Sequence, residues 1–563
     1  MTLLTTVGAP TGRTGEATIP PPAACLSPAR AFGLPLVFTL GLVALGLLDA
    51  IRQSTNLLWS FMGAGATLLA WNALLFGLAL VRGRTLTLEI VPRKQHYLQA
   101  CAQTAVLLYW GWHWPQVYDS AHLVAAQLVF AYAFDMLLCW SRRDTYTLGF
   151  GPFPIIFSIN LFLWFKPDWF YFQFLMVALG FAAKELIRWD KEGRRAHIFN
   201  PSSFPLAVFS LSLILTGMSD ITWGRDIAIT QFFPPHMYLM LFLVGLPGQF
   251  FFGVTSMTMA AVVTTYLFGL VYFAVTGIYF FYDSYIPIAV FLGMHLLFTD
   301  PSTSPRTELG RVMFGVLYGL SSVALYQLLG GAGLPTFYDK LLQVPILNLS
   351  IKLIDRAARS KMLRAFDPAA LGRSLAPRQR NLAYMSVWAI VFAVMSAAQG
   401  VGDRHPGQWV PFWQQACDEE RPYACAYLGD MQLIFCRAGS GWACNEAGIL
   451  HAGLRQAQAA LSSSKGALSR SGENQRRPDP AEALGSLERG CELGFDPACQ
   501  NLTRMTTGAG PLASAPPTLD DYPIVLRGTK GAITDRTPSA LYARACTQGW
   551  PDTCGRAGRV GGE

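Results

Sequence analysis

The stretch Thr299-Asp300-Pro301-Ser302-Thr303-Ser304-Pro305 places one acid, four hydroxyls and two prolines directly after the apolar run from 286 to 298. Proline cannot continue a helix, so the backbone groups that these two prolines free need other partners. Broken backbone at membrane depth is tolerated only where it is buried in protein or lines a cavity. The stretch therefore predicts either a ligand site between membrane helices or a tight exit turn capped by its own hydroxyls.

The composition indicates a membrane protein with an appended domain. Of 563 residues, 52% are hydrophobic and 14% are charged, and long apolar runs recur up to residue 400 but not beyond it. The sequence predicts a polytopic helical bundle of about 11 to 13 spans in a lipid bilayer. The expected spans are residues 31–51, 56–81, 97–117, 121–140, 146–165, 169–187, 203–217, 237–253, 257–277, 284–299, 309–329, 340–354 and 381–400.

Charge patterning sets the expected orientation. The net charge of +8 comes from short basic clusters between apolar runs, which is typical of cytoplasmic loops and not of a nucleic-acid-binding surface. We expect a disordered cytoplasmic tail (1–30), a basic cytoplasmic linker (358–380) and a last span (381–400) that leads to a periplasmic domain (401–563). These features predict a multi-pass protein of a bacterial inner membrane, with its N-terminus in the cytoplasm.

A second motif precedes the opening one. Residues 197–204 read His-Ile-Phe-Asn-Pro-Ser-Ser-Phe, a basic loop followed by a Phe-Asn-Pro entry into a short span. Gly310-Arg311 follows the opening stretch, and residues 348–356 read Asn-Leu-Ser-Ile-Lys-Leu-Ile-Asp-Arg. The order and spacing of these motifs resemble those of the RnfD/NqrB family, which includes the shorter UnbU-like proteins, over roughly residues 145 to 357. The expected domains are therefore N-terminal transmembrane helices (31–145) and an RnfD/NqrB-like domain (146–357).

Members of the resembled family are membrane subunits of ion-translocating electron-transport complexes. The resemblance implies a helical domain that binds a flavin, FMN or riboflavin, and passes electrons alongside other electron-transport subunits. Residues 252–256 lie where the family has Gly-x-x-Gly-Glu-Thr-Ser, but Val254 replaces the acid. The resemblance gives these candidate cofactor-binding residues: Asn200, Pro201, Thr255, Ser256, Thr299, Asp300, Thr303, Ser304, Gly310 and Arg311.

One departure concerns the attachment of the flavin. The family links FMN to a threonine in a Ser-Gly-Ala-Thr motif on an outer loop, and the corresponding loop, residues 218–236, contains no such motif. The similar string Ala64-Gly65-Ala66-Thr67 lies within the second span, where small residues commonly serve helix packing. We therefore expect a noncovalent flavin. No catalytic residue is assigned, and no metal site is expected.

The last part of the chain carries a separate signal. Eight cysteines form four pairs, each with seven residues between its members: Cys417 and Cys425, Cys436 and Cys444, Cys491 and Cys499, Cys546 and Cys554. This spacing lacks the Cys-x-x-Cys pattern of zinc sites and predicts bridges that each join one helix to the next. Disulfides persist outside the cytosol, in agreement with the expected orientation. The pattern resembles Hcp-type Sel-like repeats, which implies a helical solenoid that binds a periplasmic protein. The alternative is a disulfide-stabilised cap without a partner. The inserts 461–480 and 506–538 are rich in Ser, Gly, Pro and Arg, and we expect them to be flexible.

The sequence thus predicts an all-α protein, a transmembrane helical bundle followed by a disulfide-stapled α/α repeat domain. The leading function is membrane electron transfer through a bound flavin, as a subunit of an electron-transport oxidoreductase that can be coupled to ion movement. Two alternatives stay open. The broken helices could serve a carrier or channel for an ion or small substrate, or the bundle could anchor the repeat domain.

Overall fold

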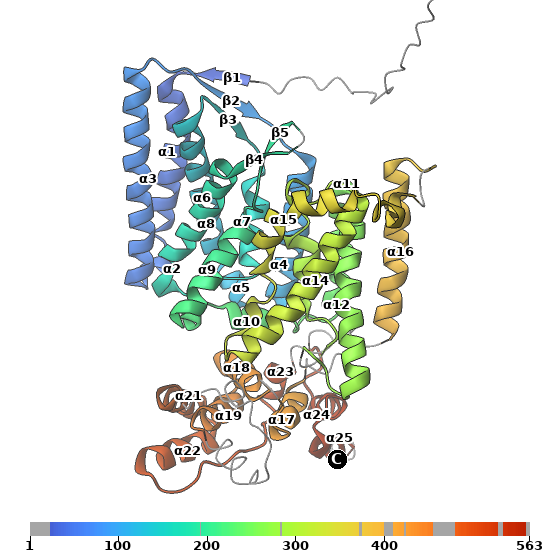
Figure 1. The fold of residues 1–563 in the computed structure, drawn as a ribbon. Helices are drawn as coiled ribbons and strands as arrows, with labels where there is room; N and C mark the ends of the chain where they lie inside the picture. Colours follow the sequence, from blue (N-terminus) through green and yellow to red (C-terminus); the bar gives the residue numbers. More distant parts are fainter. Residues whose placement is uncertain are drawn as a thin grey trace, which may run out of the picture.

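The computed structural model describes residues 23–191, 193–281, 284–370, 374–398, 409–421, 424–453, 479–526 and 533–558. Helices dominate, and the predicted all-α class is confirmed. Figure 1 shows a helical bundle with a smaller helical domain, residues 409–558, packed against one end; we call it the disulfide domain. The short strands lie at the opposite end of the bundle. We call the two ends of the bundle the strand end and the disulfide end.

Six helices of the described chain are long and apolar enough to cross a membrane. They are α1 (Pro28–Leu45), α3 (Thr55–Val81), α6 (Ala121–Arg142), α12 (Thr255–Thr276), α14 (Glu308–Gly331) and α16 (Pro377–Ala397). Between 22% and 61% of the most apolar 18-residue window of each helix is buried. The remaining apolar side chains face outward, as expected for helices that contact lipid.

Helices that are shorter or less apolar occupy the other expected spans. They are α4 (Lys94–His113), α7 (Pro152–Asn160), α8 (Tyr171–Leu186), α9 (Ser203–Thr216), α11 (Met237–Phe252), α13 (Ile288–Leu292) with the π-helix Gly293–Leu297 behind it, and α15 (Gln343–Ala358). The Gln343 side chain donates to Ser322 Oγ (2.8 Å), which places the start of α15 beside the middle of α14. Ser322 lies nine residues before Gly331, so α15 begins about 14 Å short of the end of α14.

Two small sheets at the strand end were not predicted. One pairs β1 (Ala23–Leu26) with β2 (Leu86–Ile90) and β2 with β3 (Thr145–Leu148), and the other is a hairpin of β4 (Arg188–Lys191) and β5 (Arg194–His197). Strands of four or five residues are too short to show a sequence period. Residues 23–30 of the expected disordered tail therefore form β1 and the start of α1, while residues 1–22 lie outside the described chain.

The linker and the last span join the two parts of the chain. Within residues 358–380 the structure describes two 3₁₀ turns, Arg364–Phe366 and Pro368–Ala370. Helix α16 then packs on α11, where the rings of Phe242 and Phe392 stack at 4.3 Å. The last two residues of the expected span, and the chain up to residue 408, lie outside the described residues.

The disulfide domain is built from helix pairs. Its helices are α17 (Val410–Asp418), α18 (Ala424–Arg437), α19 (Gly441–His451), α21 (Pro480–Glu492), α22 (Asp496–Thr507), α23 (Tyr522–Val525), α24 (Pro538–Thr547) and α25 (Pro551–Ala557). All four predicted bridges form: Cys417–Cys425, Cys436–Cys444, Cys491–Cys499 and Cys546–Cys554. Each bridge lies where one helix ends and the next begins, as predicted.

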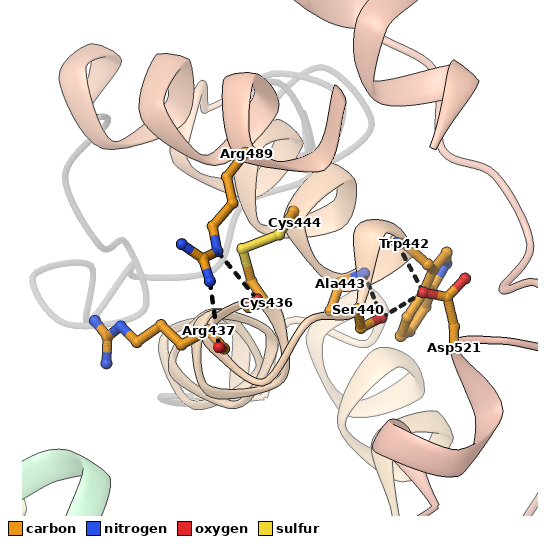
Figure 2. The surroundings of a disulfide bond; sticks show 8 residues. All are labelled: Cys436, Arg437, Ser440, Trp442, Ala443, Cys444, Arg489 and Asp521. Carbon is orange, nitrogen blue, oxygen red and sulfur yellow. Dashed lines mark hydrogen bonds between the residues drawn. A yellow bond between two sulfur atoms is a disulfide. The ribbon is translucent and has the colours of Figure 1, made fainter. Parts of the chain in front are cut away.

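Several segments of the disulfide domain meet around the Cys436–Cys444 bridge (Figure 2). Arg489 of α21 donates to the carbonyls of Cys436 and Arg437, both at 3.4 Å. On the other side, Asp521 accepts from the hydroxyl of Ser440 at 2.8 Å and also from the amide of Trp442. The bridge therefore lies where α18, α19, α21 and the segment before α23 meet.

The segment between α22 and α23 was expected to be flexible, and its described part is instead bound to the helices. Asn501 exchanges two hydrogen bonds with the backbone of Ala513 (2.8 and 2.9 Å), and the Trp442 indole donates to the carbonyl of Ala515. Ser514 donates to Glu446 at 2.6 Å. Buried polar side chains of α19 and α22 thus hold a segment whose composition alone suggested a linker. Most of the other expected flexible insert, 461–480, lies outside the described residues.

Candidate functional site

The loop after the π-helix satisfies its own broken backbone at the strand end. Thr299 Oγ1 donates to the carbonyl of His295 (3.1 Å), and Ser304 Oγ donates to the carbonyl of Asp300 (2.6 Å). The Asp300 carboxylate accepts from the amide of Ser302 (2.9 Å) and so caps the 3₁₀ turn that follows. These side chains give backbone groups of the interrupted helix local partners, which is the feature expected of a turn capped by its own hydroxyls.

The β4–β5 hairpin clamps the same loop. His197 Nε2 lies 3.0 Å from Asp300 Oδ2, and buried Lys191 donates to the carbonyls of Ser302 (3.2 Å) and Ser304 (2.8 Å). Burial opposes ionisation of Asp300, but the hydrogen bond and charge of His197 and the Ser302 amide outweigh it, so the pKa of Asp300 lies below its ordinary value. Lys191 and His197 are therefore part of the site, although they are absent from the predicted set.

Asn200 joins three helices. Its Oδ1 accepts from the amide (3.0 Å) and hydroxyl (2.8 Å) of Ser202 and from the next amide, at the start of α9. Its Nδ2 donates to the carbonyl of Leu297 at the end of the π-helix (2.9 Å). Its backbone amide donates to Asn348 of α15, whose own amide donates to the carbonyl of Thr303. One predicted residue thus ties α9, the π-helix and α15 together.

Asp355 ties α15 to the start of α14. Its carboxylate accepts from the amide of Arg306 (3.0 Å) and from the amide (3.1 Å) and hydroxyl (3.0 Å) of Thr307. The Thr307 hydroxyl in turn caps α14 at the amide of Gly310 (3.1 Å). Asn348 and Asp355 are seven residues apart, which places both on one face of α15. The sequence contained this signal in the 348–356 motif, but Asp355 was not predicted as a site residue.

Arg311, Thr255 and Ser256 form a second group beside the first. Arg311 donates to the carbonyl of Gly253 and to Glu308, both at 2.7 Å, and Ser256 donates to Glu308 at 2.9 Å. Glu308 of α14 therefore supplies a carboxylate close to the position where Val254 replaces the acid of the resembled family. Thr255 instead donates to Asn381 of α16 (3.1 Å). The group joins α11, α12, α14 and α16.

Two of the predicted site residues, Pro201 and Gly310, contribute through close backbone packing. The carbonyl of Pro201 lies against Gly180 of α8, where an added Cβ would clash with it. An added Cβ on Gly310 would lie 3.0 Å from Asp355 Oδ1. Both positions serve close packing of the broken helix ends.

Most polar groups of the site are bonded within the protein. Asn200 and Asp300 use their polar atoms in bonds to the protein, so they position the loop and are not free to bind a ligand. Three basic residues lie around that loop, but Lys191 is bonded to backbone carbonyls and Arg311 pairs with Glu308; the third is Arg306. Of these, Arg306 is exposed, and its guanidinium has no hydrogen bond within the described chain. This charge suits a phosphate. In the described residues no group of three His, Cys, Asp or Glu side chains could hold a metal ion.

At the disulfide end, the disulfide domain packs on α10 (Gly224–Thr230). Arg437 of α18 lies 3.3 Å from Asp226 and over the ring of Trp223, and Phe435 stacks on Phe233 at 5.5 Å. Burial raises the pKa of Asp226 to about 6; the positive charge of Arg437 opposes this rise and the negative charge of Asp430 adds to it. Apolar and charged contacts together therefore hold the disulfide domain on the bundle.

Comparison with models of protein families, with curated proteins and with solved structures finds no match to this chain. The resemblance to the RnfD/NqrB family and to Sel-like repeats rests on the motifs alone. The structural conclusion is a membrane-type helical bundle whose motif residues meet at its strand end, joined to a disulfide-bonded helical domain at the other.

Proposed function

We propose that this chain is a membrane electron-transfer protein that binds FMN or riboflavin noncovalently at the strand end. The proposal rests on one observation: the two motif segments lie together and share hydrogen bonds. Asn200 and the 299–305 loop are about one hundred positions apart, and they share one hydrogen-bonded network with Asn348. The network fixes broken helix ends, a setting that suits an anionic group.

The residues of the network divide into two roles. Asn200, Asp300 and Asp355 position the helix ends, because their polar atoms bond to backbone groups. Arg306, with its exposed guanidinium, would hold the phosphate of FMN, and Lys191 would add charge beside it. A bound flavin would supply the electron-accepting and electron-donating ring. Thr67 of the Ala-Gly-Ala-Thr string donates within α3 to the carbonyl of Gly63, which supports noncovalent binding.

The placement of charge and disulfides supports the proposed topology. Basic clusters, including the β4–β5 hairpin, lie at the strand end, and the bridges lie at the other end (Figure 1). We therefore place the strand end in the cytoplasm and the disulfide domain in the periplasm of a bacterial inner membrane. In this arrangement other electron-transport subunits contact the bundle, and a periplasmic protein binds the disulfide domain.

The flavin content of two charge variants tests the proposal. Arg306→Gln removes an exposed charge from the site, and Arg142→Gln removes an exposed charge at the end of α6, three residues before β3 of the strand end. We expect Arg306→Gln to lose most of its FMN and Arg142→Gln to keep the wild-type content. The released flavin is measured by fluorescence and identified by mass. Equal FMN content in both variants would contradict the phosphate assignment.

One observation favours a carrier as the second candidate. Asp339 and Lys340 are 2% and 5% exposed and pair at 3.3 Å in the turn before α15, which begins part-way along the bundle. Buried charges beside half-helices are typical of ion and substrate paths. Flavin-free protein whose reconstituted vesicles conduct protons or Na⁺, with conduction lost in Lys340→Met, would favour this function.

A further inference from the structure

A groove on the outside of the bundle lies apart from the site described above. It has a volume of about 290 Å³ and runs between α3, α6 and α8. Aromatic side chains line it together with Gly63, Ala64 and Thr67 of α3. Trp59, at 69% exposed, and Leu175, at 54% exposed, line its edge. Because these helices face lipid, the groove is open to the bilayer.

The lining selects an apolar occupant. Its walls include Trp59, Trp71, Phe130, Phe134 and Phe174. The two hydroxyls on α3 are already bonded, since Ser60 donates to the carbonyl of Asn56 and Thr67 to that of Gly63, both at 2.8 Å. The hydroxyl protons of α3 are thus already used within the helix, and the mostly apolar and aromatic lining makes burial of hydrocarbon the main source of affinity.

The length of the groove suits a single hydrocarbon chain. From Trp59 to Trp71 the groove follows twelve residues of α3, or about 18 Å. The acyl chains of one leaflet extend about 15 Å, which is half of the hydrocarbon core of a bilayer. One acyl chain therefore matches the length of the groove.

The disulfide end of the groove carries a polar group. Asp168, exposed in the turn just before α8, accepts from Ser54 and Asn56 at the start of α3, both at 3.4 Å. Trp59 and Tyr171 line this same end, at the depth where aromatic residues commonly meet lipid head groups. An exposed carboxylate there complements a primary amine.

We propose that the groove binds one acyl chain of an amine-bearing phospholipid from the leaflet at the disulfide end. The chain lies on Gly63 between the aromatic walls, and the amine lies at Asp168. This binding site is independent of the flavin site and fixes a lipid beside α3, α6 and α8.

Two glycines of α3 provide a matched test. An added Cβ meets nothing within 4 Å at either Gly63 or Gly77, and Gly77 lies outside the groove. Gly63→Leu should therefore fill the groove, and Gly77→Leu should place the same side chain on the same helix without filling it. The purified protein is stripped with detergent, given phosphatidylethanolamine and measured by native mass spectrometry.

We expect one retained phosphatidylethanolamine per chain in the wild type and in Gly77→Leu, and at least a fivefold lower occupancy in Gly63→Leu. Asp168→Asn should bind phosphatidylethanolamine and phosphatidylglycerol equally, whereas the wild type prefers the former. Equal occupancy in the two glycine variants would overturn the proposal. So would loss of a co-purifying membrane protein from Gly63→Leu with its lipid content unchanged, because the groove would then hold a partner helix.

Discussion

Replacing Asp355 with alanine tests whether the α14–α15 junction depends on this one carboxylate. The change removes the acceptor of three donors, the amides of Arg306 and Thr307 and the Thr307 hydroxyl. Each lost hydrogen bond to a part-buried donor costs about 1 to 1.5 kcal/mol, which sums to about 3 to 4.5 kcal/mol. Thr307 also caps α14, so the cap should weaken with it.

The free energy of unfolding is measured by tryptophan fluorescence in mixed micelles. Asp190→Ala is the control, because Asp190 is exposed at the same end and makes no side-chain hydrogen bond within the described chain. The control should change stability by less than about 0.5 kcal/mol. A loss in Asp355→Ala no larger than in the control would refute the role given to Asp355.

Three further predictions concern the rest of the chain. Asp226 has a pKa of about 6 when folded and an ordinary value of 3.8, so the folded protein binds more protons between these values. Its contribution to stability is thus present below pH 3.8 and lost as pH rises through 6. In thermal unfolding, the wild type should therefore be more stable at pH 5 than at pH 7 through this group, and Asp226→Asn should remove that difference. Removing the Cys436–Cys444 bridge with two serines should cost about 2 to 3 kcal/mol in non-reducing unfolding, and unchanged stability would contradict its role. Gly315→Ala should lower the melting temperature, because the added Cβ would strike the Met257 carbonyl of α12, whereas Gly331→Ala has open space and should not.

The helices were predictable because their signal is local. Apolar runs of the required length mark the membrane helices, and the eight-residue cysteine repeat marks each helix junction of the disulfide domain. The strands were missed because four-residue segments carry no usable period. Residues 188–197 were interpreted only as a basic loop, although the hairpin that they form clamps the 299–305 loop.

The site was predictable only in part, since its contacts join distant positions. The motifs identified Asn200 and Asp300, and both lie in the network at the strand end. Apart from their charge, nothing in the sequence indicated that Lys191 and Glu308 belong to the site. The residues with which they form hydrogen bonds are about 111 and 52 positions away in the chain. Sequence pattern also could not show that the side chains of Asn200 and Asp300 would be used by the protein itself.

Noncovalent binding of a flavin by the bundle is tested most directly by an absorption and fluorescence spectrum of the detergent-purified protein. The protein comes from flavin-replete cells, and the spectrum is recorded before and after acid precipitation. We expect a flavin spectrum in the protein and yellow colour in the supernatant after precipitation. Colourless protein would contradict flavin binding, and colour kept in the pellet would contradict noncovalent attachment.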